Sequence, residues 1–169
     1  YVCAAFTRVL KGLIAVSRLT FPRGITGRDI DAFARAPLWE AGQDFAHGTG
    51  HGVGHFLTVH EGPQGISSKS TIPFEAGMIV SNEPGYYLEG EFGIRTENLL
   101  VVTSTPDGNF LHFQTLNFVP IDKNLIEKDL MSTDEIVWLN EYHSQCREKI
   151  RAHLDENERI WLDHATNKL

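Results

Sequence analysis

Residues 78–102 have the sequence MIVSNEPGYYLEGEFGIRTENLLVV, in which two apolar runs flank a glycine-containing turn. The apolar run on each side of the turn is typical of a strand. A turn centred on Gly90 makes the two strands antiparallel neighbours, and opposed residues then have numbers with a constant sum. The stretch therefore predicts an antiparallel hairpin in which Glu83 lies opposite Glu97.

The opposition of Glu83 and Glu97 predicts a cation site. Opposed Cβ atoms lie about 5 Å apart, and opposed like charges destabilise a sheet. Both glutamates flank apolar strands, where a carboxylate without a partner is costly. A cation between them would turn repulsion into attraction. A register slip of one residue would send the side chains to opposite faces, and the alternative interpretation is a pair of ordinary surface glutamates.

Histidines gather just upstream of this hairpin. The segment from His47 to His55 has the sequence HGTGHGVGH, and VHEGP follows at 59–63. Imidazole and carboxylate together hold divalent first-row metals, and the glycines let backbone approach backbone so that imidazoles can converge. A single histidine is more often structural than a ligand, but this cluster favours a site, with His51 as the metal ligand. No role is expected for His55, and surface positions are expected for His112, His143, His153 and His164.

Four segments in order resemble the pita-bread metallopeptidases, and among them the aminopeptidase P branch. They are residues 47–54, 59–63, 82–87 and 94–98. The family also contains prolidase and methionine aminopeptidase. The resemblance implies an α+β fold, a partial pita-bread domain whose curved antiparallel sheet has helices on its outer face. The segment WLNEYH at 138–143 is similar to the helical C-terminal extension of the cytosolic long form.

The resemblance implies that His51, Glu83 and Glu97 are metal ligands. Glu97 would bridge two divalent cations, which are expected to be Mn²⁺. The family's dinuclear site also needs two aspartates on strands upstream of the first helix, and the aspartates at positions 29, 31 and 44 do not match that motif. We therefore expect this chain to be a C-terminal part of the enzyme, inactive alone, with the N-terminal part of the same enzyme as a candidate partner.

The resemblance also implies the catalytic roles. Glu83 would handle the proton of the attacking water as well as hold metal. His47 and His60 would contact the substrate and steady the tetrahedral intermediate, and Arg95 would orient neighbouring groups. The implied activity is release of the N-terminal residue from peptides whose second residue is proline.

Two other functions stay open. A non-catalytic pita-bread module would bind peptides or proteins without chemistry, and fold alone does not separate it from an enzyme. Such a module has no need of the three ligands, which argues against it. A prolidase-like dipeptidase would use the same chemistry on dipeptides, but the segment at 138–143 favours the aminopeptidase.

The composition restricts the classes of partner. The apolar fraction is 41% and the net charge −7, so the chain has an ordinary globular composition and is not expected to bind nucleic acid. No apolar run approaches the ~20 residues that span a bilayer. Cys3 and Cys146 are far apart, and we expect both to be reduced thiols in a cytoplasmic protein.

Helical periodicity indicates two helices before the histidine cluster. The first opens the chain. The second is capped by Thr26, with Asp29 in capping-box position and Ile30, Phe33 and Ala34 on one face. Pro37 should kink or restart it, and Gly42 can end it. Further strands are expected over 56–59, 93–102 and 110–119, the last two joined by a turn at 106–109.

Residues 1–120 are assigned to the pita-bread domain and residues 121–169 to the helical extension. A capping box at Ser132 begins a helix with an apolar stripe of Ile136, Leu139 and Tyr142, and a short final helix surrounds Trp161. In the family that the chain resembles, the long form is often a homodimer that is built through its C-terminal domain. We therefore expect the extension to form a homodimer.

Overall fold

The computed structural model describes residues 1–56 and 58–169, which divide into two compact units. The larger unit comprises Arg8–Leu116, and the smaller one comprises Tyr1–Thr7 with Asn117–Leu169. The proposed domain boundary at residue 120 lies near this division and stays a proposal. Within the described residues, no helix has both the length and the apolar composition needed to cross a bilayer.

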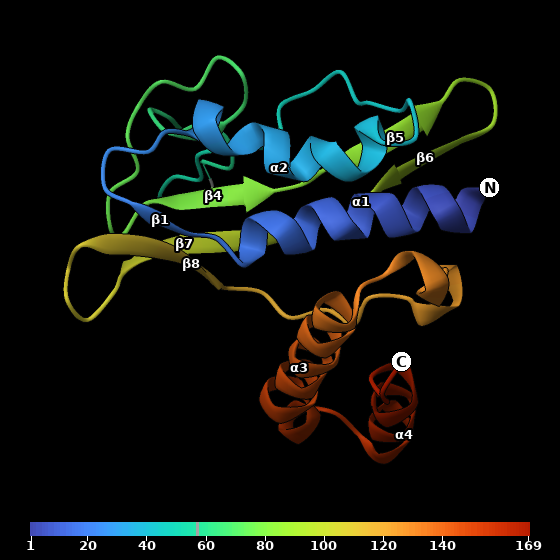
Figure 1. The fold of residues 1–169 in the computed structure, drawn as a ribbon. Helices are drawn as coiled ribbons and strands as arrows, with labels where there is room; N and C mark the ends of the chain where they lie inside the picture. Colours follow the sequence, from blue (N-terminus) through green and yellow to red (C-terminus); the bar gives the residue numbers. More distant parts are fainter. Residues whose placement is uncertain (57) are drawn as a thin grey trace. The chain divides into compact units, whose positions relative to one another are not determined.

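A four-stranded antiparallel sheet with the order β1-β8-β7-β4 supports the larger unit (Figure 1). Its strands are β1 (Thr20–Pro22), β4 (Ile79–Asn82), β7 (Asn98–Ser104) and β8 (Phe110–Thr115). The predicted turn between the last two strands is confirmed, since the amide of Thr105 donates to the carbonyl of Phe110 at 3.0 Å. Strand β8 is shorter than the predicted 110–119.

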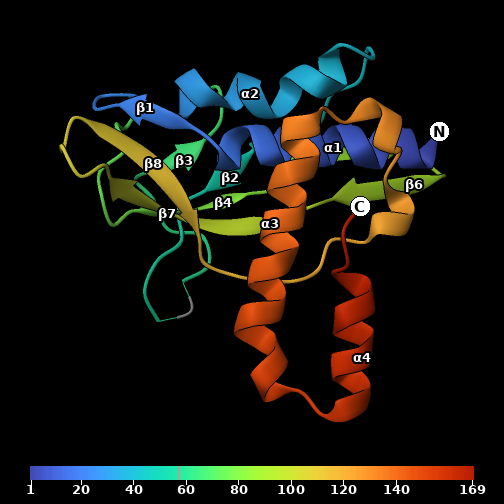
Figure 2. The same cartoon turned by 60° about the horizontal axis from the view of Figure 1, so that its bottom comes forward.

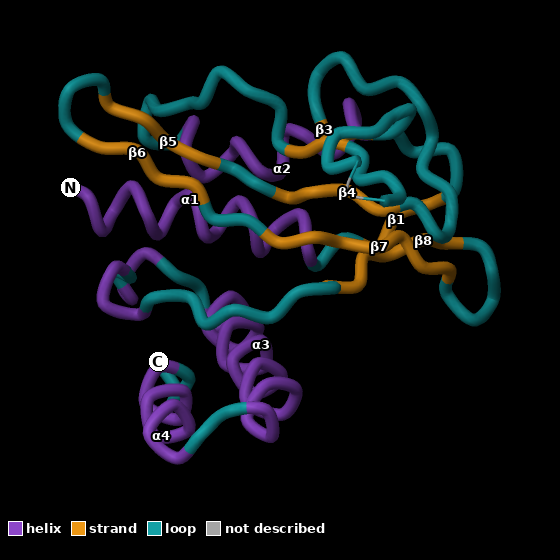
Figure 3. The backbone as a smooth tube through the Cα atoms, turned by 180° about the vertical axis from the view of Figure 1, so that it is seen from behind, coloured by secondary structure: helices purple, strands orange, loops and turns teal. Residues whose placement is uncertain are grey.

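The hairpin predicted from residues 78–102 is confirmed (Figure 3). Strand β5 (Gly85–Leu88) pairs with β6 (Phe92–Arg95), Gly85 lies opposite Arg95, and Asn82 lies opposite Asn98. The same constant sum therefore holds on both sides of the two glutamates. The single strand predicted over 93–102 is divided, because the ladder is interrupted between β6 and β7 and leaves Glu97 outside both strands.

The glycine-rich segment lies along the outer edge of β4. Short strands β2 (Gly50–His51) and β3 (Gly65–Ile66) pair with each other, and the amide of Val53 donates to the carbonyl of Ile79 at 3.0 Å. A Cβ on Gly50 would overlap the carbonyl of Ser81, so this approach needs glycine. The strand predicted over 56–59 is wrong for residues 56, 58 and 59, and residue 57 lies outside the described residues.

Helices α1 (Val2–Ser17) and α2 (Gly27–Trp39) pack together on one face of this sheet. The capping box of Thr26 and Asp29 is confirmed. Pro37 does not restart α2, which continues through it to Trp39. A Cβ on Gly12 would overlap the carbonyl of Ala34, so the two helices pack backbone against backbone.

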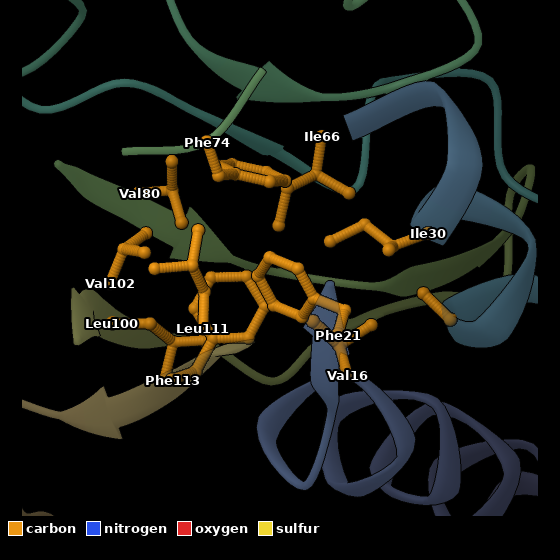
Figure 4. Packing of buried hydrophobic residues seen from close by; sticks show 11 residues of the cluster. Val16, Phe21, Ile30, Ile66, Phe74, Val80, Leu100, Val102, Leu111 and Phe113 are labelled. Carbon is orange, nitrogen blue, oxygen red and sulfur yellow. The ribbon is translucent and has the colours of Figure 1, made fainter. Parts of the chain in front are cut away.

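The core of the larger unit lies between these helices and the sheet. Val16 and Ile30 come from the two helices and point toward the sheet residues (Figure 4). Ile30 and Ala34 are buried, but Phe33 is 48% exposed. The prediction that Phe33 lies on the same helix face as Ile30 and Ala34 is therefore wrong. The other members of the cluster are Phe21, Ile66, Phe74, Val80, Leu100, Val102, Leu111 and Phe113.

The smaller unit contains a helical hairpin of α3 (Thr133–Ile150) and α4 (Glu156–Ala165), which lie side by side in Figures 1 and 2. The 3₁₀ helices Lys123–Leu125, Lys128–Leu130 and Arg151–His153 complete the unit. The capping box at Ser132 is confirmed. Leu139, Tyr142 and Cys146 are buried within this unit and Ile136 is half-buried, so most of the predicted stripe covers its own fold.

His143 was predicted on the helix surface and is instead fully buried, with 0% exposure. Its Nε2 accepts a hydrogen bond from the amide of Ile121 at 3.1 Å, because the chain at 119–121 lies over this side of α3. Burial, then the charges of Lys123 and Arg147, lower the pKa of His143 from 6.5 to about 4. Helical periodicity could not show which segment covers the helix.

Candidate metal centre

Three predicted ligands, His51, Glu83 and Glu97, converge in the larger unit. One ligand atom of each lies within 4.8 Å of the others. His51 ends β2, Glu83 follows β4, and Glu97 lies between β6 and β7. The hairpin register brings the two carboxylates together, and the strand along the edge of β4 adds the imidazole.

Backbone and hydroxyl groups hold Glu83 beside His51. The amide of Glu83 donates to the carbonyl of Thr49 at 2.7 Å. The hydroxyl of Ser81 donates to Glu83 Oε1 at 2.8 Å and accepts from the amide of His51 at 2.9 Å. Asn82 is buried, and its side-chain Nδ2 donates to the carbonyl of Leu13 at 2.9 Å, which ties β4 to α1. The position of Glu83 is therefore fixed from both sides.

The chemistry of these donors fits a divalent cation. His51 Nδ1 lies 2.9 Å from the carbonyl of Gly52, which can only accept, so Nδ1 carries a proton. In the neutral ring, the Nε2 lone pair then faces Glu83 Oε1 at 3.2 Å. Both atoms are hydrogen-bond acceptors, so they cannot bond to each other directly. A metal ion satisfies both atoms, and the carbonyl fixes the tautomer that a ligand histidine needs. A second proton on His51 would also satisfy the pair, and metal analysis separates the two states.

The raised pKa of Glu97 also supports a cation site at this position. Its pKa is raised, first by burial and then by the negative charge of Glu83, although His51, Arg95 and His60 lower it. The Glu83 carboxylate thus lies close enough to raise the pKa of Glu97, and a cation between the two carboxylates would relieve this repulsion.

A chain of hydrogen bonds surrounds this centre. His47 Nδ1 faces the carbonyl of Gly48 at 2.8 Å, so its Nε2 accepts from the hydroxyl of Tyr87 at 2.9 Å. Arg95 Nε donates to the same hydroxyl at 2.8 Å, and Arg95 Nη1 lies 3.5 Å from Glu83. The pKa of Arg95 is raised, and the hydrogen bond to Tyr87 is the largest cause of this rise.

Tyr87 is the residue that sequence reasoning missed. The signal was present in the register: Gly85 opposes Arg95, so Tyr87, two residues further along the same strand, lies on the same face in a diagonal position. That position lets one hydroxyl join His47 to Arg95.

Five of the six predicted site residues line one cavity of about 260 Å³: His47, His51, His60, Glu83 and Arg95. The sixth, Glu97, is not among the residues that line it. The rings of His51 and His60 lie 4.1 Å apart between centroids. His55 is exposed, with its ring against Phe56. Three aspartates that did not match the metal motif serve elsewhere: Asp29 caps α2, while Asp31 and Asp44 bind Arg35.

The sequence profile of metallopeptidase family M24 matches residues 3–104, and that of the C-terminal region of peptidase_M24 matches residues 109–169. The "Probable Xaa-Pro aminopeptidase P" of Laccaria bicolor is 49% identical over 98% of this chain and 27% of its own length. Aminopeptidase P1 of Lotus japonicus is 46% identical over 96% of this chain and 26% of its own length. The chain thus spans about a quarter of the length of these relatives.

Among solved structures, X-prolyl aminopeptidase from Caenorhabditis elegans, described as a cytosolic enzyme with a di-nuclear active site, superimposes with a TM-score of 0.94. It is 40% identical, and the match covers 99% of this chain and 29% of that one. Prolidase from Pyrococcus furiosus gives a TM-score of 0.55 at 30% identity, covering 67% of this chain and 32% of its own. These matches confirm the pita-bread fold, and the chain belongs to metallopeptidase family M24.

Proposed function

We propose that this chain is the C-terminal part of a metallo-aminopeptidase that releases the N-terminal residue from peptides with proline at the second position. The observation that carries the proposal is the convergence of one imidazole and two carboxylates within 4.8 Å. The similarity to Xaa-Pro aminopeptidases along nearly the whole chain supports the substrate class.

In the complete protein, His51, Glu83 and Glu97 hold two divalent cations together with donors from the rest of the enzyme. When bound, such ions supply Lewis acidity that lowers the pKa of water and polarises a carbonyl. Manganese is the expected metal. The carboxylate of Glu97 would help to hold both cations, and a carboxamide could not supply the same negative charge.

Glu83 has a second task, which is to accept the proton of the attacking water and pass it toward the departing proline nitrogen. Its place suits this task, because Ser81 and the carbonyl of Thr49 hold it from the strand side while its other oxygen faces Arg95. Arg95 keeps the carboxylate oriented.

His47 and His60 border the same cavity and contact the substrate. The charge that develops on the carbonyl oxygen needs donors that are already in place. Because Tyr87 donates to His47 Nε2, the ring of His47 is held in one orientation, and the hydrogen-bond chain continues through Arg95 to Glu83. The ring of His60 packs against the ring of His51 in a tilted arrangement at the edge of the centre.

The chain by itself is proposed to be inactive. Three donors are too few to enclose two cations, so the N-terminal part of the same enzyme is the expected partner. The smaller unit is proposed to support a homodimer, and the complete protein is proposed to act in the cytoplasm.

One set of assays tests these proposals. The complete protein should contain two metal ions per chain, cleave Xaa-Pro-Xaa tripeptides and prefer them to Xaa-Pro dipeptides. The 169-residue chain should cleave neither peptide. A preference for dipeptides would favour a prolidase, and an absence of metal and cleavage in the complete protein would favour a non-catalytic binding module.

A further inference from the structure

Arg35 is a buried arginine that the proposed chemistry does not use. It lies in the second half of α2 and is 9% exposed. Its guanidinium donates to the carboxylates of Asp31 and Asp44, both at 2.8 Å, and to the carbonyls of Phe45 and His47, both at 2.7 Å. Burial lowers the pKa of Arg35, but the hydrogen bonds to the two aspartates help to raise it above its ordinary value, so the group stays charged.

Asp31 continues this network one helical turn before Arg35. Its Oδ1 accepts from the hydroxyl of Thr49 at 2.6 Å, and both residues are buried. The carbonyl of Thr49 in turn accepts from the amide of Glu83. Arg35 and Asp31 together therefore hold residues 45, 47 and 49, which are alternate positions of one irregular segment.

The segment at 44–49 has no regular secondary structure. Its backbone is not fixed by a ladder, so contacts from outside the segment must set its position. Arginine suits this task, because a planar fork can reach several acceptors at once, whereas a lysine ammonium is a single point charge. The Arg35 guanidinium also lies 4.0 Å from the centroid of the Phe45 ring.

The position of the segment decides where the His47 imidazole lies. The ring of Phe45, held by Arg35, packs against the ring of His47 with 4.8 Å between centroids. On its other side, His47 meets the hydroxyl of Tyr87 at 2.9 Å. A shift of the backbone at 45–47 would break this contact before it disturbed the three proposed metal ligands.

We infer that Arg35, assisted by Asp31, is a positioning residue that fixes the His47 imidazole against Tyr87 through the backbone of residues 45–49. The inference about geometry stands on these contacts. Its catalytic consequence rests on the proposed function, in which His47 contacts the substrate. Arg35 acts through the backbone of other residues, and it is neither one of the three proposed metal ligands nor one of the residues that line the cavity.

A double-mutant cycle in the complete protein tests the consequence. Arg35→Lys should lower kcat/KM for an Xaa-Pro-Xaa peptide between about 10-fold and 100-fold, since misplacement by about 1 Å can cost 10²-fold. Metal content should stay at the wild-type level. In a His47→Ala background the same change should cost less than about twofold, because the group that it positions is gone. Equal losses in both backgrounds would overturn the inference and leave Arg35 as a general stabilising residue.

Arg28→Lys is the matched control. Arg28 lies on the same helix but is exposed, and its Nε donates to the carbonyl of Ser68 at 3.0 Å. This variant should keep wild-type kcat/KM. If Arg35→Lys does not fold, Asp31→Asn replaces it, with the same dependence on His47 and a smaller loss.

Crystal structures of the variants give a result that does not need turnover. The 2.9 Å contact between His47 and Tyr87 should be lost in Arg35→Lys and kept in Arg28→Lys. An unmoved His47 ring in Arg35→Lys would overturn the inference. If the wild-type protein cleaves no peptide, the proposed function fails, and the crystal structures still decide whether Arg35 positions His47.

Discussion

His51 in the larger unit and His143 in the smaller one are both held by backbone groups, but their surroundings differ. His51 donates to the carbonyl of Gly52 and turns its other nitrogen toward a carboxylate. His143 accepts from the amide of Ile121, is fully buried, and has Lys123 and Arg147 as its charged neighbours. The first arrangement calls for a cation, whereas the second excludes one.

The difference gives a criterion that separates a proposed ligand histidine from a structural one. Around His51, Glu83 and Glu97 bring negative charge that the fold itself only partly balances. The pKa of Glu97 is raised first by burial and then by the negative charge of Glu83. Around His143, burial and positive charge keep the imidazole neutral. The sign of the nearby charge, and not burial alone, marks the site.

At the proposed metal centre around His51, loss of the Glu83 carboxylate should have the largest effect on activity. Glu83→Gln in the complete protein removes both a ligand charge and the group proposed to accept the water proton, so kcat should fall by about 10³-fold or more. Peptide cleavage assays measure it. Activity within tenfold of wild type would show that Glu83 has neither role.

His60→Ala should separate catalysis from metal binding at the same centre. His60 lines the cavity, but it is not among the three converging ligands. Turnover should fall by about 10²-fold while metal content stays unchanged. Elemental analysis beside the kinetic assay gives both values. A fall in metal content equal to the fall in turnover would make His60 a ligand and break the distinction.

On the His143 side, the expected effect is on stability. The folded pKa is about 4 and the unfolded value 6.5, so the unfolded chain takes up a proton first as the pH falls. Stability from this group is present above pH 6.5 and is lost as the pH falls toward 4, by about 3 kcal/mol. Urea unfolding at pH 7 and pH 4 measures the loss.

The control for this prediction uses two substitutions in the same unit. His143→Gln should remove most of the pH dependence assigned to this group. His153→Gln should leave it unchanged, because His153 is exposed. Identical pH dependence in the wild type and His143→Gln would show that His143 does not titrate as its burial predicts.

A substitution in the proposed dimer interface should have the smallest effect, which is a change in oligomeric state alone. Trp161 in α4 is 61% exposed, although most of the predicted stripe on α3 is buried. Trp161→Ser should therefore shift the complete protein from dimer toward monomer, as measured by light scattering, without loss of helix content. Phe33→Ser, an exposed aromatic of the larger unit, is the matched control. No change in mass for Trp161→Ser would remove the smaller unit as the interface.

Local patterns were enough to predict the hairpin and the carboxylate pair. The turn at Gly90 predicts the register, and the register places Glu83 opposite Glu97. Capping boxes at Thr26 and Ser132 were equally local, and both are confirmed. Short-range geometry depends on few residues, so the sequence contains it directly.

Long-range packing produced the errors. His143 lies on a helix whose covering segment begins more than twenty residues earlier, and periodicity does not identify that segment. Phe33 follows the helical spacing but faces away from the core. Tyr87 and Arg35 were missed because their partners come from distant elements or from irregular backbone. Roles that depend on the rest of the enzyme lie beyond any local pattern.

The metal content of the complete protein, with and without Glu97→Gln, tests the central proposal most directly. Elemental analysis should find two divalent ions per chain in the wild type and at most one in the variant, because a carboxamide cannot bridge two cations. Turnover should fall together with metal content. Two ions in both proteins, or none in the wild type, would contradict the assignment of His51, Glu83 and Glu97 as a dinuclear centre.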